Sequence, residues 1–289
     1  MTTSSPGPFK VACIQNTATR DLDENMETAG ALVREAAAAG ADFIALPEHC
    51  ALMEPRREIL HQHAASLDEH PILAQFQTLA AEVGRWLLVG SLPARSPDGR
   101  IANCSVLLNG DGAVVASYDK IHMFDVDLPS GEKFRESDDF QPGPEARLAE
   151  TPWGTMGMTV CYDLRFPQLY RGLAQSGARF LTVPAAFTKV TGDAHWHVLL
   201  RARAIENGCF VIAPCQTGNH YGKRFTCGHS LIIDPWGEVL ADGGDEVGVV
   251  MAEIDPARVD EVRAMIPSLG HDRPFNVTGS RTTRISAVS

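Results

Sequence analysis

Short apolar runs alternate with segments of helical period along the first third of the chain. The runs 9–15, 42–46 and 86–91 are rich in apolar residues and predict strands. Apolar residues recur at helical spacing over 22–40 and 71–83, which predicts two helices. Strands that alternate with helices in this way are typical of α/β folds.

Polar residues and glycines mark the ends of these two helices. Asp23 is expected to cap the amino-terminal end of the first helix, and Gly40 is expected to end it. The second helix is expected to stop at Gly84. Both segments are therefore bounded by signals that agree with their hydrophobic period.

Two predicted hairpins interrupt the alternation. The first pairs 104–108 with 113–118 across a turn that contains Asn109-Gly110, and the second pairs 229–234 with 239–242. The remaining expected elements are helices at 167–176, 195–207 and 256–265 and strands at 179–183, 209–213 and 247–254. Two helix-bearing halves, each with a hairpin, indicate two sheets packed face to face with helices outside, in a single α/β domain.

Three segments lack such periodicity. Residues 121–144 form a long acidic and aromatic loop, and loops of this length in a compact domain usually carry function. Residues 1–8 are rich in Ser, Thr, Pro and Gly and are expected to be a flexible end, while 267–289 are polar and are expected to form an arm or tail. The folded domain is therefore expected over residues 9–266.

Composition narrows the class of protein. The net charge of −11 argues against a nucleic-acid surface, which would be basic, but it leaves a small anionic substrate open. No window approaches the about 18 apolar residues that span a bilayer, and the chain start has no apolar signal segment. The cysteines are odd in number and include no C-x-x-C pair; they lie at positions 13, 50, 104, 161, 209, 215 and 227. This pattern favours a reducing compartment, and a cytoplasmic location is expected.

Cys161 stands at a predicted sharp turn. An apolar run ends at this cysteine, a polar turn follows, and a helical pattern starts near Pro167, a residue suited to a first helical turn. The turn would expose the sulfur at the carboxyl end of a strand. It would also set backbone N–H groups beside the sulfur, which favours the thiolate and could bind an oxyanion. The alternative is a buried structural thiol, a common state of free cysteine.

Two further residues with reactive side chains end predicted strands. Glu48 follows the strand 42–46, and Lys120 follows the second strand of the first hairpin. Strand ends in α/β folds gather at one rim, where ligands bind. A cysteine nucleophile needs a base, and an ammonium can stabilise the negative oxygen that develops on a carbonyl under attack. Glu48, Lys120 and Cys161 together therefore form a candidate catalytic site.

Three motifs around these residues resemble the signatures of the nitrilase, or carbon–nitrogen hydrolase, superfamily. They are Leu46-Pro47-Glu48, the segment 118–125 (YDKIHMFD) and the segment 161–167 (CYDLRFP), in the family's order and spacing. The resemblance extends from about residue 9 to residue 266. It implies a four-layer α–β–β–α sandwich and a Glu–Lys–Cys triad that needs neither a cofactor nor a metal.

The resemblance also implies a role for each site residue. Glu48 would act first as general base and then as general acid, and Lys120 would stabilise the tetrahedral intermediates. Cys161 would attack an amide carbonyl, release ammonia and leave a thioester that water hydrolyses. The backbone N–H of Tyr162 would complete the oxyanion hole. Glu136 matches the second glutamate with which many members position substrate and lysine; the alternative is an ordinary loop carboxylate.

The motif CYDLRFP resembles the branch of omega-amidases and deaminated glutathione amidases. This branch implies a primary amide substrate that also carries a carboxylate, with Arg165 as the partner of that carboxylate and Phe187 and Thr191 lining the same pocket. A guanidinium suits that task because its planar fork binds carboxylate through two hydrogen bonds. The alternative for Arg165 is an ion pair on the helix surface or at a dimer interface.

Some positions depart from the pattern of the branch. His197 stands where many members carry Glu, and the segments 216–220 and 269–274 also differ. The departures leave the acyl group of the substrate and the role of the tail open. The family implies a homodimer or larger homo-oligomer, with contacts through 167–176 and 195–207.

Other functions compete with this reading. Within the superfamily, the chain could be an N-carbamoyl amide hydrolase or a nitrilase. It could also be a catalytically inactive scaffold, although no triad member is missing. A zinc site is the rival from another class, because seven candidate ligands crowd one region: His195, His197, Cys209, Cys215, His220, Cys227 and His229. Against zinc, His195 and His197 would point to different helix faces, and no closed ligand spacing is present.

Overall fold

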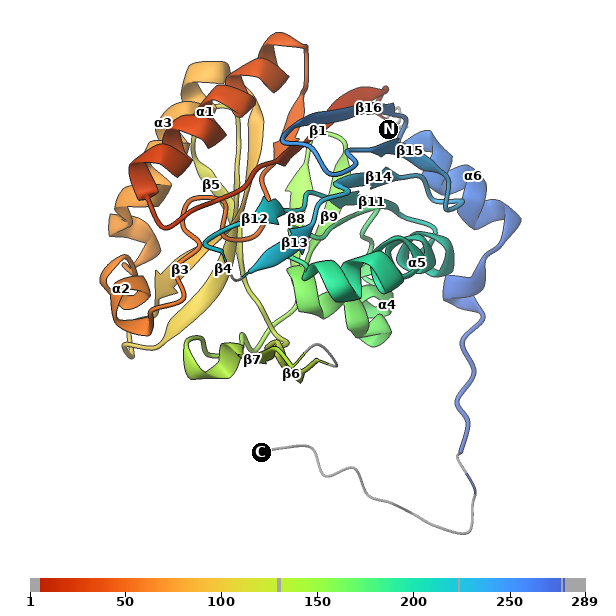
Figure 1. Ribbon diagram of the computed structural model, residues 1–289. Coiled ribbons are helices and arrows are strands. Elements are labelled where there is room, and N and C mark those ends of the chain that lie inside the picture. Colours follow the sequence, from red (N-terminus) through yellow and green to blue (C-terminus); the bar gives the residue numbers. More distant parts are fainter. Residues whose placement is uncertain (1–5, 129–130, 223, 277, 279–289) are drawn as a thin grey trace.

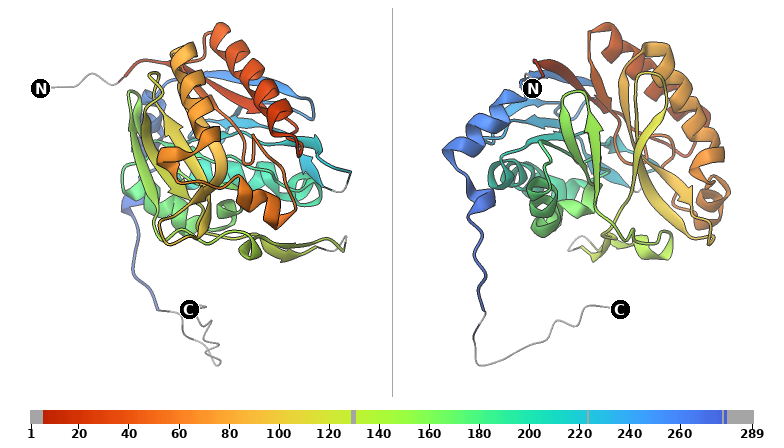
Figure 2. Two further views of the ribbon diagram at one scale, coloured as in Figure 1. Left: turned by 90° about the vertical axis from the view of Figure 1, so that its left-hand side faces the viewer. Right: turned by 180° about the vertical axis from the view of Figure 1, so that it is seen from behind.

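Two six-stranded sheets pack face to face in the computed structural model, with helices outside both (Figures 1 and 2). The structure describes residues 6–128, 131–222, 224–276 and 278 of the 289-residue chain. The predicted α–β–β–α sandwich is confirmed.

The first sheet has the strand order β16-β1-β2-β3-β4-β5. Its strands are β1 (Phe9–Gln15), β2 (Phe43–Ala45), β3 (Trp86–Arg95), β4 (Ile101–Leu108), β5 (Val114–Asp119) and β16 (Gly248–Ile254). β1, β2 and β3 are parallel, whereas β4 runs antiparallel to both β3 and β5. β5 therefore runs in the same direction as β2, so the carboxyl ends of these two strands lie at one edge.

The second sheet has the order β15-β14-β11-β10-β9-β8. Its strands are β8 (Arg147–Thr151), β9 (Gly154–Met158), β10 (Phe180–Thr182), β11 (Phe210–Ala213), β14 (Leu231–Ile233) and β15 (Val239–Asp242). The three central strands β9, β10 and β11 are parallel. The second predicted hairpin is formed by β14 and β15.

Helices cover the outer face of each sheet (Figure 1). The helices are α1 (Leu22–Ala38), α2 (Arg57–Gln62), α3 (Pro71–Val83), α4 (Pro167–Gln175), α5 (Lys189–Asn207) and α6 (Ala257–Met265). α1 and α3 lie over the first sheet, and α4 and α5 lie over the second. Two small hairpins complete the fold: β6 (Asp125–Asp127) with β7 (Lys133–Arg135), and β12 (Thr217–Asn219) with β13 (Phe225–Cys227).

The two sheets meet in an apolar interface that includes aromatic stacking. The Phe9 ring of β1 stacks on Trp153 at 4.2 Å and meets the edge of Phe180, in β10, at 5.6 Å. Phe9 and Phe180 belong to one core cluster that takes residues from both sheets, and the partly buried Trp153 packs against it. Stacked and edge-to-face pairs at such distances add to the apolar burial of the rings. This packing fixes one sheet relative to the other.

Several boundaries differ from those expected. Asp21, not Asp23, caps α1, because the Asp21 carboxylate accepts the backbone N–H groups of Asp23 and Glu24. α5 starts at Lys189, six positions before the predicted 195. Gly192 lies inside this extra turn, where a Cβ would come within 2.3 Å of the Cys227 Cβ. Tight packing, rather than helix propensity, therefore selects a glycine there.

Other elements carried no sequence signal. β6, β7 and β8 are mostly exposed and lack a sustained apolar alternation, so a hydrophobic pattern could not indicate them. The loop predicted over 121–144 thus contains a hairpin and a 3-10 turn, Glu136–Asp138.

Part of the predicted tail contacts the domain. Arg171 of α4 pairs with Asp272 and donates to the carbonyl oxygen of Ser268 at 2.6 Å. Within the described ranges, no helix is both long and apolar enough to cross a membrane. The predicted homo-oligomer stays a prediction, and α5 exposes apolar side chains for it at Val190, Val198 and Ile205.

Gly90 is expected to be intolerant of a side chain. A Cβ there would lie 2.1 Å from the Leu46 carbonyl oxygen and 2.2 Å from that of Pro47, and these backbone atoms cannot turn aside. Gly90→Ala should lower the free energy of unfolding by about 1–3 kcal/mol, as overpacking does. Urea unfolding measures this change.

Gly248→Ala is the matched control, since Gly248 also lies in a strand of the first sheet but has nothing within 4 Å of a built Cβ. Its free energy of unfolding should stay within about 0.5 kcal/mol of wild type. Equal unfolding free energies for the two variants would contradict the assigned contact.

Candidate active site

Three strand ends place the candidate catalytic residues at one cavity. Glu48 lies just after β2, Lys120 directly follows β5, and Cys161 lies three residues after β9. All three line a cavity of about 320 Å³, together with Glu136. The structure therefore brings together the four predicted catalytic residues.

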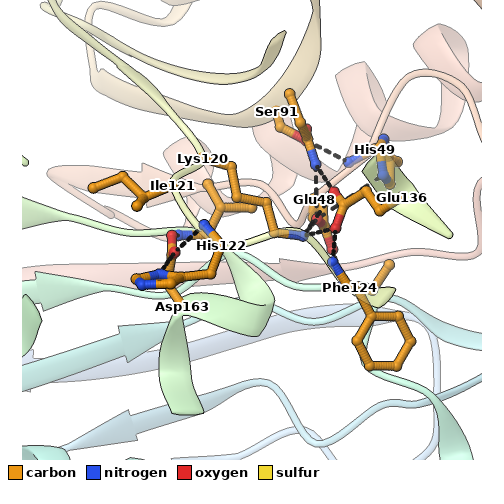
Figure 3. Close-up of polar contacts among 12 residues, drawn as sticks. Glu48, His49, Ser91, Lys120, Ile121, His122, Phe124, Glu136 and Asp163 are labelled. Carbon is orange, nitrogen blue, oxygen red and sulfur yellow. Dashed lines mark hydrogen bonds and ion pairs between the residues drawn. The ribbon is translucent and has the colours of Figure 1, made fainter. Parts of the chain in front are cut away.

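A buried ammonium joins two carboxylates in this cavity (Figure 3). Lys120 Nζ donates to Glu48 Oε1 at 2.9 Å and to both oxygens of Glu136 at 2.8 Å. The side chains of Lys120 and Glu48 are each 2% exposed, and that of Glu136 is 11% exposed. Glu136 is thus a direct partner of Lys120 and not an ordinary loop carboxylate.

The two carboxylates also accept hydrogen bonds from uncharged N–H groups. Asn103 Nδ2 lies 2.9 Å from Glu48 Oε1 and 3.1 Å from Glu136 Oε1, so one amide bridges both groups. The backbone N–H of Ala186 donates to Glu48 Oε2 at 2.8 Å, and that of Phe124 donates to Glu136 Oε2 at 2.7 Å. Asn103 was not predicted. The sequence feature that could have indicated it is a polar residue within the otherwise mostly apolar run 101–108, all of which is buried.

Charge and burial set the resting protonation of the triad. Burial alone raises the pKa of Glu48, but the charges of Lys120 and His49 and hydrogen bonds from Cys161 and Lys120 lower it to about 2. Burial lowers the pKa of Lys120, whereas the two carboxylates raise it above its ordinary range. Glu48 is therefore a carboxylate and Lys120 an ammonium at neutral pH.

Cys161 rests as a thiol. Burial raises its pKa well above the ordinary range, and Glu48 adds to this rise through its charge and by accepting a hydrogen bond from the thiol. The positive charge of Lys120 acts in the opposite direction but does not prevail. The expectation that the turn would favour a thiolate at rest is therefore wrong, since burial and Glu48 outweigh the local N–H groups. The thiol already faces the carboxylate that could take its proton.

Asp163 holds the turn that presents Cys161. This turn is a 3-10 helix, Cys161–Arg165, and Cys161 itself has a φ of 48°. One Asp163 oxygen accepts the Tyr118 hydroxyl at 2.7 Å and the Val160 N–H at 2.9 Å. The other accepts the His122 N–H at 3.1 Å and contacts His122 Nδ1 at 2.7 Å. Tyr118 and His122 flank Lys120, so Asp163 ties the Cys161 turn of one sheet to the Lys120 segment of the other.

The cavity lining extends the predicted binding residues. Of the residues predicted to bind substrate, Tyr162, Phe187 and Thr191 line it. The rest of the wall includes residues that were not predicted as site residues: His49, Leu52, Met53, Phe124, Phe134, Phe140, Tyr221 and Arg224. Phe124, Phe134 and Phe140 come from the long aromatic loop, so this loop forms part of the site. Sequence could not show which of its side chains turn inward.

Arg165 does not line the cavity. Its guanidinium lies 5.8 Å from the Tyr162 ring centroid and 5.5 Å from that of Phe187, both of which are lining residues. Its terminal nitrogens are 3.4 Å from His195 Nδ1. Within the described part of the chain, no carboxylate forms an ion pair with Arg165. Its role as a substrate partner stays a prediction.

The ligands of the zinc alternative lie in different places. Cys215 Sγ and Cys227 Sγ are 3.8 Å apart in the core. His197 and His229 instead flank Asp242, with contacts of 3.0 and 2.8 Å to its two oxygens, and their donor atoms lie within 4.8 Å of one another. This group is away from the Cys161 cavity lining. Each histidine has the carboxylate as its partner, so the contacts are those of histidine–aspartate pairs.

The sequence is similar to known proteins over most of its length. A family model described as carbon-nitrogen hydrolase matches residues 10–264. The chain belongs to the carbon–nitrogen hydrolase family. This membership confirms the predicted resemblance and makes the protein an amidase, a hydrolase of carbon–nitrogen bonds other than peptide bonds. It sets aside the inactive scaffold.

Relatives of this carbon–nitrogen hydrolase extend over most of its length. It is 42% identical over 269 residues to a deaminated glutathione amidase of Synechocystis sp., covering 91% of this chain and 98% of the relative. The solved structure of the C. elegans NitFhit protein has a TM-score of 0.86 at 35% identity, covering 93% of this chain and 66% of that chain. A mutant amidase from Nesterenkonia sp. AN1 has a TM-score of 0.75 at 25% identity, covering 92% and 98%, and carries the acetamide moiety of fluoroacetamide covalently on its active-site cysteine.

Removal of the Lys120 ammonium is expected to destabilise this carbon–nitrogen hydrolase in a pH-dependent way. Lys120→Met should lower the free energy of unfolding by about 3–5 kcal/mol at pH 7, because two buried carboxylates lose their counterion. Without the ammonium, the folded-state pKa of Glu48 should rise above its unfolded value, so the variant gains stability as the pH falls. The difference from wild type should therefore be smaller at pH 5, as measured by urea unfolding.

In wild type, the Glu48 pKa of about 2 lies below its ordinary 4.5, so the contribution of Glu48 to stability is complete above pH 4.5 and is lost only toward pH 2.

Arg34→Met is the control, since Arg34 pairs with Glu82 where the side chains are 53% and 48% exposed. It should cost less than about 1 kcal/mol at either pH. A Lys120→Met difference that is the same at pH 7 and pH 5 would contradict the pairing.

Proposed function

We propose that the protein hydrolyses an amide that carries a carboxylate, through a thioester on Cys161. Deaminated glutathione and the ω-amide of a 2-oxo acid are the leading substrates. The carrying observation is the geometry of the cavity, which Glu48, Lys120 and Cys161 line together and in which the Glu48 carboxylate accepts a hydrogen bond from the Lys120 ammonium at 2.9 Å. Identity of 42% to a deaminated glutathione amidase supports the substrate class.

The first step forms the carbon–sulfur bond. Glu48 takes the thiol proton as Cys161 Sγ attacks the amide carbonyl, and the carbonyl π electrons move onto oxygen. The thiol is protonated at rest, so the base is needed at this step. The Lys120 ammonium and the Tyr162 backbone N–H stabilise the oxyanion that develops.

The second step breaks the carbon–nitrogen bond. Protonated Glu48 gives its proton to the leaving nitrogen, the amine departs, and the acyl group remains on Cys161 as a thioester. Glu48, again a carboxylate, then takes a proton from water as the water attacks the thioester. Return of that proton to the sulfur regenerates the thiol and releases a carboxylic acid. Glu136 holds the Lys120 ammonium throughout, at 2.8 Å from each of its oxygens.

The leading substrates differ in their leaving group. An ω-amide of a 2-oxo acid is a primary amide and releases ammonia. Glutathione joins its γ-glutamyl group to the amine of cysteinylglycine, so the amide of the deaminated form releases that dipeptide instead. Ammonia release, as expected from the family motifs, therefore applies only to the primary amide. Assays must detect the acid product as well as ammonia.

Cys161→Ala should abolish turnover while the fold remains. Removing the nucleophile should lower kcat by at least about 10⁴-fold, because no other group can form the acyl intermediate. The measurement is acid release over a panel of carboxylate-bearing amides, nitriles and N-carbamoyl compounds. The amides should be the preferred class; preference for a nitrile or N-carbamoyl compound would favour the alternative activities of the family.

Cys50→Ala is the matched control for the cysteine change. Cys50 is fully buried and its thiol pKa is raised by burial, but it does not line the cavity. This variant should keep turnover within about threefold of wild type. Unchanged turnover in Cys161→Ala would overturn the mechanism.

Arg165→Ala should raise the KM for carboxylate-bearing amides by about tenfold or more, since a charged hydrogen-bond partner is lost. The KM for neutral amides should change little. Steady-state kinetics on matched charged and neutral amides measures the difference. An equal rise in both KM values would assign Arg165 to support of the Tyr162–Phe187 wall instead.

A further inference from the structure

A second arginine reaches the cavity that Arg165 does not line. Arg224 lies directly before β13 and contributes to the lining. Its Nη2 donates to the Ala186 carbonyl oxygen at 3.1 Å, and its guanidinium lies 5.3 Å from the Phe134 ring centroid. Its Nε is buried and has no hydrogen-bond partner among the described residues. A buried donor without a partner is costly, and it is satisfied when a ligand supplies an acceptor.

Several other charged groups of the lining have an ion-pair partner. Lys120 is held by Glu48 and Glu136. Arg135 pairs with Asp127 through two contacts of 3.0 Å. Glu54, a carboxylate of the same wall, accepts two hydrogen bonds from Arg56 at 2.8 and 2.6 Å. Within the described ranges, no carboxylate forms an ion pair with Arg224, in contrast to these groups.

Contacts through Ala186 locate Arg224 on the Glu48 side of the cavity. The Ala186 carbonyl accepts from Arg224, and its N–H donates to Glu48 Oε2 at 2.8 Å. Burial is the largest cause that lowers the pKa of His49, the sequence neighbour of Glu48, and the charge of Arg224 lowers it further. Arg165 instead lies against Tyr162 and Phe187. The two guanidinium groups therefore approach the site from different walls.

In the proposed mechanism, these two walls face different parts of the substrate. Glu48 protonates the leaving nitrogen, so the leaving group lies toward Glu48 and toward Arg224. A guanidinium binds a carboxylate more strongly than a neutral acceptor, because charge and two parallel hydrogen bonds act together. A cavity of about 320 Å³ is within the range of small-ligand pockets.

We propose that Arg224 binds a carboxylate on the leaving-group side of the scissile amide. Of the two leading substrates, this role favours the one whose leaving group is a peptide with a free carboxylate over the primary amide. This inference rests on the proposed function, because it uses the role of Glu48 as the acid that protonates the leaving group.

Two matched substrates test the proposal. Both are ω-amides of the same 2-oxo dicarboxylic acid with the same dipeptide. The dipeptide ends in a free carboxylate in one substrate and in a carboxamide in the other. Wild type should prefer the carboxylate form by about tenfold or more in kcat/KM. Arg224→Gln should lower kcat/KM for that form by about 10- to 100-fold, mainly through KM, and should change the carboxamide form by less than about threefold. Arg224→Lys should restore part of the preference, since it keeps the charge but not the fork.

Arg85→Gln is the control, because it removes the same charge from a residue outside the cavity lining. It should leave kcat/KM for both substrates within about threefold of wild type.

Wild type without a preference, or equal losses for both substrates in Arg224→Gln, would overturn the assignment of Arg224 and leave the amidase mechanism standing. If wild type hydrolyses neither amide but does hydrolyse a primary amide, the assignment fails alone. If no carboxylate-bearing amide is hydrolysed, the proposed function fails with it. The wild-type preference and Arg224→Lys keep the test decisive if Arg224→Gln does not fold.

Discussion

One buried ammonium between two buried carboxylates is the interaction on which the site depends. Removing three charges from water is costly, and attraction offsets that cost only when the geometry is close and the remaining oxygens have donors. Lys120 meets this condition, with contacts of 2.8 to 2.9 Å to Glu48 and Glu136. Asn103 serves both carboxylates, and Ala186 and Phe124 satisfy the other oxygens through their backbone N–H groups. The network is therefore a fixed electrostatic frame around the nucleophile.

The fold supplies this frame from separate layers. Glu48 and Lys120 come from strands of the first sheet that end at one edge, whereas Cys161 comes from the second sheet. Asp163 connects them by accepting bonds from Tyr118 and His122 on either side of Lys120. A shift of one sheet against the other would thus misplace the thiol relative to its base. Because the thiol is protonated at rest, that distance governs whether the nucleophile can form at all.

The hydrophobic pattern predicted the layered fold, and the strand ends predicted a candidate site, because strand period and rim position are local properties of the chain. The family resemblance was needed to identify the three residues as a triad. Asn103, Asp163 and Arg224 could not be assigned this way. Their partners lie far away in sequence, and only the packing of sheets and loops brings them together. Arg165 shows the limit of a motif: the motif names the residue, but its guanidinium lies against the Tyr162 and Phe187 rings and not in the cavity lining. The start of α5 was missed for the same reason, since contact with Cys227 selects the glycine within it.

The central claim is that hydrolysis proceeds through an acyl group bound to Cys161. Rapid acid quenching during turnover of a carboxylate-bearing amide, followed by intact-protein and peptide mass spectrometry, tests it most directly. The account predicts a mass gain equal to the acyl group, confined to the peptide that contains Cys161. Turnover without any adduct, or an adduct on one of the other six cysteines, would contradict it.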